Sequence, residues 1–155
     1  MKGEDGIEAA VVETIETPAG ATEGFILEAI EMKGFMRYLE KTDPPLRFPE
    51  KFTVITGRTG AGKSSILDAI TFALYGSTTR TDIQGVKTSE VCRPGGYVRI
   101  AFRQGDSHWE VTRGFTTKKE SYLGVARDGE TVPGTIPEKE RTIRDVVGLD
   151  YDGFR

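Results

Sequence analysis

A glycine-rich run at residues 57–65, Gly-Arg-Thr-Gly-Ala-Gly-Lys-Ser-Ser, constrains the fold of this chain more than any other stretch. It matches the pattern GxxxxGK[ST], which has structural meaning only where a strand leads into it and a helix leads out. Both flanks are present. Residues 52–56 form a short β-forming run, and apolar residues recur at helical spacing from Ile66 to Leu74 before Gly76. The pattern predicts a phosphate-binding loop (P-loop) between a strand and a helix.

The residue types in this run explain how it would bind a nucleotide. Successive backbone N–H groups point into one concavity at the positive end of a helix dipole, and glycines let the backbone approach the phosphates. Lys63 is predicted to reach the β- and γ-phosphates, and Ser64 to place its hydroxyl on Mg²⁺. Lys63 is therefore the predicted catalytic residue and Ser64 the predicted metal ligand. The predicted nucleotide-binding residues of the loop are Gly57, Arg58, Thr59, Gly60, Ala61, Gly62, Lys63, Ser64 and Ser65.

Length and charge narrow the class of protein. At 155 residues the chain is long enough for one domain with a buried core. No apolar stretch approaches the roughly 18 residues that a membrane span needs, so we expect no membrane association. Residues 1–24 carry one Lys and six acidic residues, a net charge of −5; because the whole chain carries −3, the remainder carries +2. We expect a mobile or weakly docked acidic extension over residues 1–24, followed by a mildly basic body that is compatible with a nucleic-acid surface.

The segments around the P-loop give further predictions. Residues 25–32 alternate in polarity and predict a strand, which bends at residues 34–38. After the P-loop helix, residues 77–91 are polar and lack a clean period. We expect them to form a loop near the nucleotide.

The second half of the chain has the pattern of a meander followed by a helix. Alternation from Gly96 predicts a hairpin that turns at residues 104–106, and a further strand over residues 122–126 precedes an Asp-Gly turn. Thr135 and Glu138 form a capping box at the start of a helix, and Gly148 ends it.

The P-loop and the helix behind it resemble the N-terminal ATPase lobe of the Rad50/SbcC family, the SMC-like DNA double-strand-break repair ATPases. The specific part is Ser-Ser-x-x-Asp-Ala-Ile at residues 64–70, because transporter ATPases usually continue with Ser/Thr-Thr-Leu. The bend at residues 34–38, the strand at residues 97–102, and residues 149–154, which look like the segment before the family's Q-loop, also agree. The resemblance covers about residues 25–155. It implies an α/β P-loop NTPase fold, the N-terminal lobe of an ABC-type ATPase head, with an antiparallel β-subdomain.

The resemblance also implies that the chain is one half of an ATPase head with ATP and Mg²⁺ as its ligands. The implied partners are a C-terminal lobe of the same protein, a second head that forms a homodimer on ATP binding, a nuclease subunit and DNA. The implied location is the cytoplasm, near the nucleoid, in a prokaryote, or the nucleus in a eukaryote. The signature motif, the Walker B acids and the switch histidine belong to the C-terminal lobe and do not occur in this sequence. We therefore expect the chain alone to bind ATP weakly and to hydrolyse almost none.

Several residues outside the loop are candidates with two interpretations each. Arg37 either contacts the nucleotide or is a solvated arginine. It lies at the strand bend where the resemblance places a residue near the phosphates, although family members often carry the basic side chain one position earlier, where this chain has Met36. Asp68 is either a helix-face acid or a magnesium ligand. A further set of basic residues either contacts DNA phosphates or occupies alternating polar positions on exposed strands: Arg99, Arg103, Arg113, Lys118 and Lys119.

Two other functional classes compete with the repair ATPase. One is the head lobe of a chromosome-organising SMC protein, which uses ATP as a clamp. The other is a self-contained small P-loop kinase or GTPase, which would need its own metal-holding acid and a specificity motif such as Asn-Lys-x-Asp, absent from this sequence.

Overall fold

The computed structural model describes residues 11–15, 24–49, 52–60, 62–82, 85–149 and 151–154. These residues form a mixed α/β structure in which strands dominate. The strands are β1 (Val11–Ile15), β2 (Phe25–Phe35), β3 (Leu46–Arg47), β4 (Phe52–Thr56), β5 (Cys92–Gln104), β6 (Ser107–Phe115), β7 (Ser121–Arg127) and β8 (Glu130–Thr131). The helices are α2 (Lys63–Tyr75), α3 (Thr79–Asp82), α4 (Thr88–Val91), α5 (Ile136–Val147) and α6 (Tyr151–Phe154).

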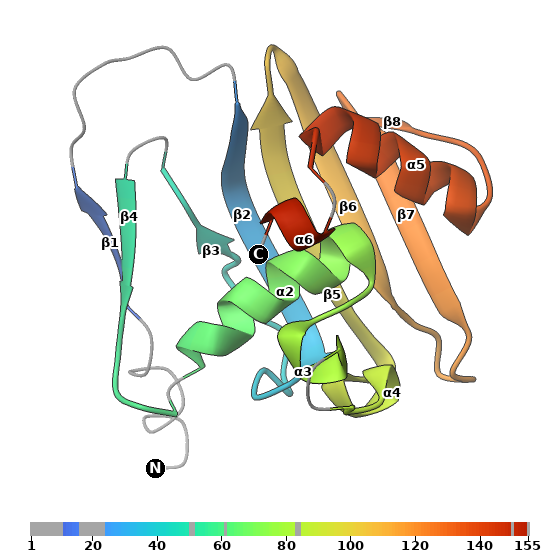
Figure 1. Ribbon diagram of the computed structural model, residues 1–155. Coiled ribbons are helices and arrows are strands. Elements are labelled where there is room, and N and C mark those ends of the chain that lie inside the picture. The colour runs from blue at the N-terminus through green and yellow to red at the C-terminus, as the bar shows by residue number, and fades with distance from the viewer. Residues whose placement is uncertain are drawn as a thin grey trace.

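A six-stranded antiparallel sheet forms the body of the molecule, with its strands in the order β3-β2-β5-β6-β7-β8 (Figure 1). The predicted alternation of apolar and polar residues along β5 determines which face of the sheet is buried. Val98, Ile100 and Phe102 are buried, whereas the intervening Arg99 is exposed. The hairpin between β5 and β6 turns at Gly105 and Asp106, within the predicted turn. The antiparallel β-subdomain predicted from the sequence is thus confirmed.

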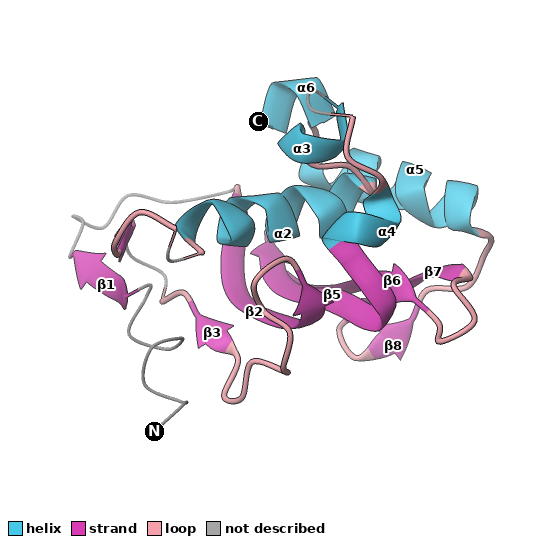
Figure 2. Ribbon diagram, turned by 90° about the horizontal axis from the view of Figure 1, so that it is seen from below, coloured by secondary structure: helices cyan, strands magenta, loops and turns pink. Residues whose placement is uncertain are grey.

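All the described helices lie on one face of this sheet (Figure 2). Helix α2 crosses the sheet and buries Ile66, Ala69 and Ala73 in the core, and the rings of Phe35 and Phe72 lie 5.3 Å apart. Because the buried side of α2 includes small alanine side chains, the helix can lie close to the strands. The main core therefore lies directly beneath the helix that follows the P-loop.

The strand that leads into the P-loop stands apart from this sheet. β4 pairs with β1 in a separate two-stranded antiparallel sheet, from Val11 opposite Thr56 to Ile15 opposite Phe52. In Figure 1 this pair lies beyond β3, at the side of the molecule where α2 begins. Five residues of the predicted N-terminal extension are thus in a strand. The rest of residues 1–24, apart from Gly24, lies outside the described residues, so the mobility of the extension stays a prediction.

The predicted loop at residues 77–91 is partly wrong, since it contains α3 and α4. At the start of α3, the backbone N–H of Thr78 donates to Oγ1 of Thr81, and the backbone N–H of Thr81 donates to Oγ1 of Thr78. At α4, the backbone N–H of Lys87 donates to Oε2 of Glu90, which caps the first turn. Such one-turn helices form through local capping bonds and carry no apolar period, which is why periodicity missed them.

Candidate functional site

The P-loop joins β4 to α2, and its last glycine begins the helix. Gly62 is the N-cap of α2 with φ of 98° and ψ of 10°, in the left-handed region. The first turn of α2 contains no acidic side chain. Since the first backbone N–H groups of a helix have no acceptor within the helix, the positive end of α2 is available to an anion.

Two glycines of the loop lie against the turn that follows β2. A Cβ built on Gly62 would lie 3.0 Å from the phenol oxygen of Tyr38, and one built on Gly60 would lie 3.3 Å from Nη1 of Arg37. The Tyr38 hydroxyl also lies 3.4 Å from the Gly62 carbonyl oxygen, to which it donates. Both glycines have positive φ, 98° at Gly62 and 81° at Gly60. The loop is therefore held in a shape that a side chain at either position would disturb.

The turn that brings Arg37 and Tyr38 to the loop is itself tightly bonded. The N–H of Tyr38 donates to the carbonyl oxygen of Phe35 at 2.8 Å, and the N–H of Met36 donates to that of Val91 at 2.8 Å. Met36 has a φ of 47°, an uncommon conformation for a non-glycine residue. Burial raises the pKa of Tyr38, and the neighbouring charge of Arg37 opposes this shift. The phenol is thus neutral at physiological pH and acts as a hydrogen-bond donor.

Sequence reasoning identified Arg37 as a candidate and missed Tyr38. The structure places both beside the P-loop, although 24 residues separate Tyr38 from Gly62 in sequence. The sequence signal for Tyr38 was the bend predicted at residues 34–38. That bend directs the consecutive side chains of Arg37 and Tyr38 toward the element that packs beside the end of the strand.

Lys63 folds back over its own loop. Its Nζ donates to the carbonyl oxygen of Gly57 and, at 3.1 Å, to that of Arg58. These carbonyl contacts hold the ammonium group at the mouth of the loop, where an incoming phosphate would compete for it. The side chain is therefore positioned for an anionic ligand at the start of α2.

The remaining predicted loop residues differ in exposure. Arg58, Thr59 and Ser64 are exposed, whereas Ser65 is 3% exposed. Ala61 lies outside the described residues. The exposed position of Ser64 suits a hydrated cation such as Mg²⁺, which keeps several water ligands. Among the residues that the structure describes, no group of three or more His, Cys, Asp or Glu gathers to hold a metal.

Asp68 faces Arg80, with 3.6 Å between Oδ2 and Nε. Burial raises the pKa of Asp68, and the charge and hydrogen bond of Arg80 oppose that shift. Its described ion-pair partner is thus in α3, which supports the helix-face interpretation of this residue. The pair ties the segment after α2 to the P-loop helix.

Arg113 lies under the carboxyl end of α2 and is 9% exposed. Its Nε and Nη2 donate to the carbonyl oxygens of Ala73 and Leu74, and its Nη1 to Glu140. It is therefore not on an exposed strand face, and the DNA-contact interpretation of this residue, which requires exposure, is wrong. The alternation from Trp109 and Val111 already placed position 113 on the inner side of β6, and this was the signal that the sequence offered.

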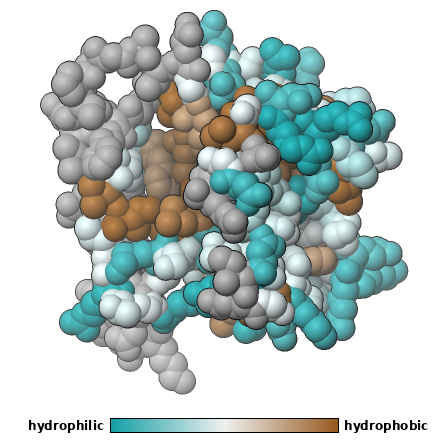
Figure 3. Space-filling view, in the orientation of Figure 1, coloured by the Kyte–Doolittle hydropathy of each residue, from teal (hydrophilic) through white to brown (hydrophobic). Residues whose placement is uncertain are grey.

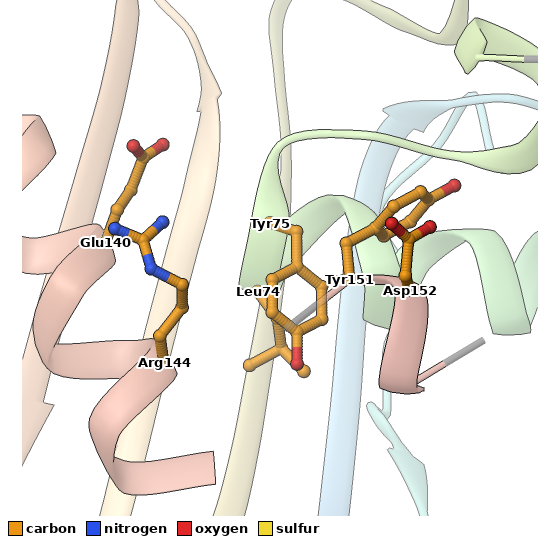
Figure 4. Close-up of a pocket in the computed structure, with 6 residues that line it drawn as sticks. All are labelled: Leu74, Tyr75, Glu140, Arg144, Tyr151 and Asp152. Atoms are coloured by element: carbon orange, nitrogen blue, oxygen red, sulfur yellow. The ribbon is translucent and has the colours of Figure 1, made fainter. Parts of the chain in front are cut away.

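Two cavities lie near this end of α2 and not at the P-loop. One, of about 230 Å³, is lined by residues of α2, α5 and α6 (Figure 4). There the Tyr75 and Tyr151 rings lie 5.9 Å apart in an edge arrangement, and the Tyr75 hydroxyl donates to the Leu149 carbonyl oxygen. The other, of about 500 Å³, lies between α2, α4, α5 and the ends of β6 and β7. The first cavity marks where α6, the segment compared with the approach to a Q-loop, contacts α2.

Comparison with known proteins gives a consistent family. The AAA domain model matches residues 29–154. The chain is 36% identical over 134 residues to a component of the nuclease SbcCD, SbcC, of Deinococcus radiodurans, a match that covers 81% of this chain and 14% of that protein. It is 34% identical over 129 residues to a probable DNA double-strand break repair Rad50 ATPase of Aquifex aeolicus, covering 81% of this chain and 13% of that protein. A Rad50 ATPase of Pyrococcus abyssi is 31% identical over 118 residues, which cover 74% of this chain and 13% of that protein.

Proposed function

This chain belongs to the AAA domain family, and we propose that it is the ATP-binding N-terminal lobe of a DNA double-strand-break repair ATPase. The observation that carries the proposal is the junction of β4 and α2. There the positive end of a helix without first-turn acids adjoins Gly62 and the ammonium group of Lys63. Backbone donors, a positive dipole end and a lysine ammonium group together suit the phosphates of a nucleotide.

In this proposal each loop residue has a definite task. The backbone N–H groups of residues 60–65 bind the phosphates, Lys63 neutralises the β- and γ-phosphate oxygens, and Ser64 holds Mg²⁺. Arg37, whose guanidinium lies beside Gly60, adds a second positive charge on the side of the β2 turn. Mg²⁺ would supply charge neutralisation of the phosphates, and the residue that fits it here is Ser64, together with the nucleotide's own oxygens.

The chain spans about one seventh of the length of the curated relatives that it matches, 14% and 13% for the first two. We propose that a C-terminal lobe of the same protein completes the head, and that two heads associate as a homodimer on ATP binding. Apolar surface beside the P-loop strand supports a missing neighbour: in Figure 3, hydrophobic residues gather around a hollow between β4 and α2. Leu67, on the outer side of α2, is 62% exposed.

The names of the relatives support the biological setting. One is part of a nuclease and two are named for DNA double-strand break repair. We propose a nuclease subunit and DNA as partners of the assembled protein. On this lobe, the basic side chains outside the core that remain candidates for DNA are Arg99, Arg103, Lys118 and Lys119.

We propose that the protein is located with the DNA, in the cytoplasm and associated with the nucleoid in a prokaryote, or in the nucleus in a eukaryote. Within the described residues, no helix is both long and apolar enough to cross a membrane.

The test is ATP binding and steady-state turnover by this chain, with Lys63→Ala as the blank. We expect calorimetry to detect Mg²⁺-dependent ATP binding that Lys63→Ala abolishes without changing the circular dichroism spectrum. Turnover by the chain alone should not exceed the blank. Equal ATP affinity in both proteins would remove the nucleotide-binding claim, and clear turnover would show that this chain already holds a complete catalytic site.

A further inference from the structure

The backbone that carries the Tyr38 phenol is fixed to the core beneath the P-loop helix. The N–H of Tyr38 donates to the carbonyl oxygen of Phe35 at 2.8 Å, and the N–H of Phe35 donates to the carbonyl oxygen of Tyr38 at 3.1 Å. Phe35 is fully buried, and its ring lies 5.3 Å from that of Phe72 in α2. Two hydrogen bonds and a core contact therefore set the position of Tyr38 relative to α2.

The Tyr38 hydroxyl contacts the peptide unit at which α2 begins. It donates to the Gly62 carbonyl oxygen at 3.4 Å, and the N–H of Ile66 donates to the same oxygen at 3.3 Å. A carbonyl oxygen has two lone pairs, so it can accept both bonds. Because a trans peptide unit is planar, its C=O and N–H point in opposite directions. The N–H of Lys63, in the same peptide unit, therefore points away from these two donors, toward the open N-terminal end of α2.

Gly62 leaves the orientation of this peptide unit open, and the phenol restricts it. Gly62 has a φ of 98°, and glycine adopts positive and negative φ about equally readily, so the residue itself does not select one orientation. The phenol fills the space in which a side chain would otherwise lie. A Cβ built on Gly62 would be 3.0 Å from the hydroxyl oxygen and 3.4 Å from Cζ of Tyr38. Tyr38 thus supplies a restraint that the glycine lacks.

We propose that Tyr38 is a positioning residue for nucleotide binding: its hydroxyl holds the Gly62 carbonyl and so keeps the Lys63 N–H directed at the phosphates. This inference rests on the proposed function, which supplies the nucleotide. In this role the phenol acts through the peptide unit and does not itself contact the nucleotide. The turn after β2 thus acts on the loop in two ways, through the charge of Arg37 beside Gly60 and through the hydrogen bond of Tyr38 to Gly62.

Two tyrosine hydroxyls at opposite ends of α2 provide a matched pair of variants. Tyr38→Phe keeps the ring beside Gly62 and removes only the donor. Tyr75→Phe is the control, because the Tyr75 hydroxyl also donates to a backbone carbonyl oxygen, that of Leu149 at 3.0 Å, at the far end of the helix. In calorimetry with Mg²⁺ we expect Tyr38→Phe to raise the ATP dissociation constant about fivefold, which corresponds to about 1 kcal/mol. Tyr75→Phe should bind ATP as the wild type does.

Inorganic tripolyphosphate distinguishes positioning of the loop from contact with the nucleoside. It carries three phosphates but neither ribose nor base. A hydroxyl that positions the loop should therefore change its dissociation constant by the same factor as that of ATP, about fivefold. The amide NMR spectrum of the free protein gives a second readout, which a general loss of stability would not move. The Lys63 amide signal should shift in Tyr38→Phe and stay in place in Tyr75→Phe.

Three results would overturn the inference. One is wild-type ATP affinity in Tyr38→Phe, and another is weaker ATP binding with unchanged tripolyphosphate binding, since the phenol would then act on the nucleoside. The third is an equal loss of affinity in Tyr75→Phe, which would assign the effect to the stability of α2.

The proposed function fails by a different result, equal ATP affinity of the wild type and Lys63→Ala. The Lys63 amide signal needs no nucleotide, so it tests the positioning even in that case. An unshifted Lys63 amide in Tyr38→Phe would refute the positioning role, whether or not the wild type binds ATP.

Discussion

Nη1 of Arg113 lies 2.9 Å from Oε1 of Glu140, an ion pair that joins strand β6 to helix α5. The same guanidinium donates to the carbonyl oxygens of Ala73 and Leu74 at the carboxyl end of α2. Burial lowers the pKa of Arg113, and the hydrogen bond and charge of Glu140 oppose that shift. One side chain thus connects the P-loop helix, the sheet and α5.

Replacing Arg113 by Met should destabilise the fold strongly. The change keeps most of the side-chain volume but leaves two carbonyl oxygens and the Glu140 carboxylate without their donor. Breaking a buried charged pair from one side costs about 3 kcal/mol in the free energy of unfolding, measured by urea denaturation. Arg127→Met is the control, because the Arg127 side chain is 58% exposed and its loss should cost less than about 0.5 kcal/mol. Equal losses in the two variants would refute the role of Arg113.

Gly62→Ala should damage both stability and nucleotide binding. Its Cβ would lie 3.0 Å from the Tyr38 hydroxyl, at a φ of +98°. We expect a loss of about 2 kcal/mol in unfolding free energy, and an ATP dissociation constant at least about tenfold higher. Gly105→Ala separates the two causes, because Gly105 has a φ of +59° with nothing within 4 Å of its added Cβ. That control should lose about 1 kcal/mol and keep its ATP affinity; a matching loss of affinity there would contradict the steric account.

Arg37→Ala should weaken ATP binding without unfolding the protein. The Arg37 guanidinium lies beside Gly60, where we propose that it contacts a phosphate. Loss of one charge-assisted contact of about 1.4 kcal/mol raises the dissociation constant about tenfold, measured by calorimetry. Arg47→Ala, at an exposed position of β3, is the control and should bind ATP as the wild type does. Unchanged affinity in Arg37→Ala would remove this residue from the site.

Tyr97 should make the stability fall at alkaline pH. Burial, followed by the 2.5 Å hydrogen bond to Glu31, raises the pKa of Tyr97 to about 12, from 10.0 in the unfolded chain. The folded state therefore favours the neutral phenol, and this stabilisation is complete below pH 10 and lost as the pH rises to about 12. Urea unfolding at several pH values should show a shallower alkaline decline for Tyr97→Phe than for the wild type. Parallel declines would show that another group controls this range.

The local features of this chain could be predicted from its sequence. The P-loop helix ends at Gly76 and α5 at Gly148, each in the left-handed conformation, because glycine adopts that conformation at a helix end without the steric cost of a Cβ. The alternation around Val98 likewise placed the buried face of the sheet. Composition and residue spacing are enough to predict a structural feature when its physical cause lies within a few residues of it.

The non-local features depended on how these elements pack. No sequence period relates Tyr38 to Gly62, or Val12 to Ile55, because the strand end, the loop and the N-terminal segment meet only after the chain has folded around the sheet.

The sequence by itself thus determined the P-loop, the strands of the main sheet from β5 to β7 and the ends of α2 and α5, since hydrogen bonding and backbone sterics within short segments decide them. Only the tertiary structure decided that the inward-facing Arg113 caps α2, that Tyr38 adjoins the P-loop, and that β1 pairs with β4. Those outcomes depend on which surfaces the packed core brings together, and burial then sets the chemistry of each side chain.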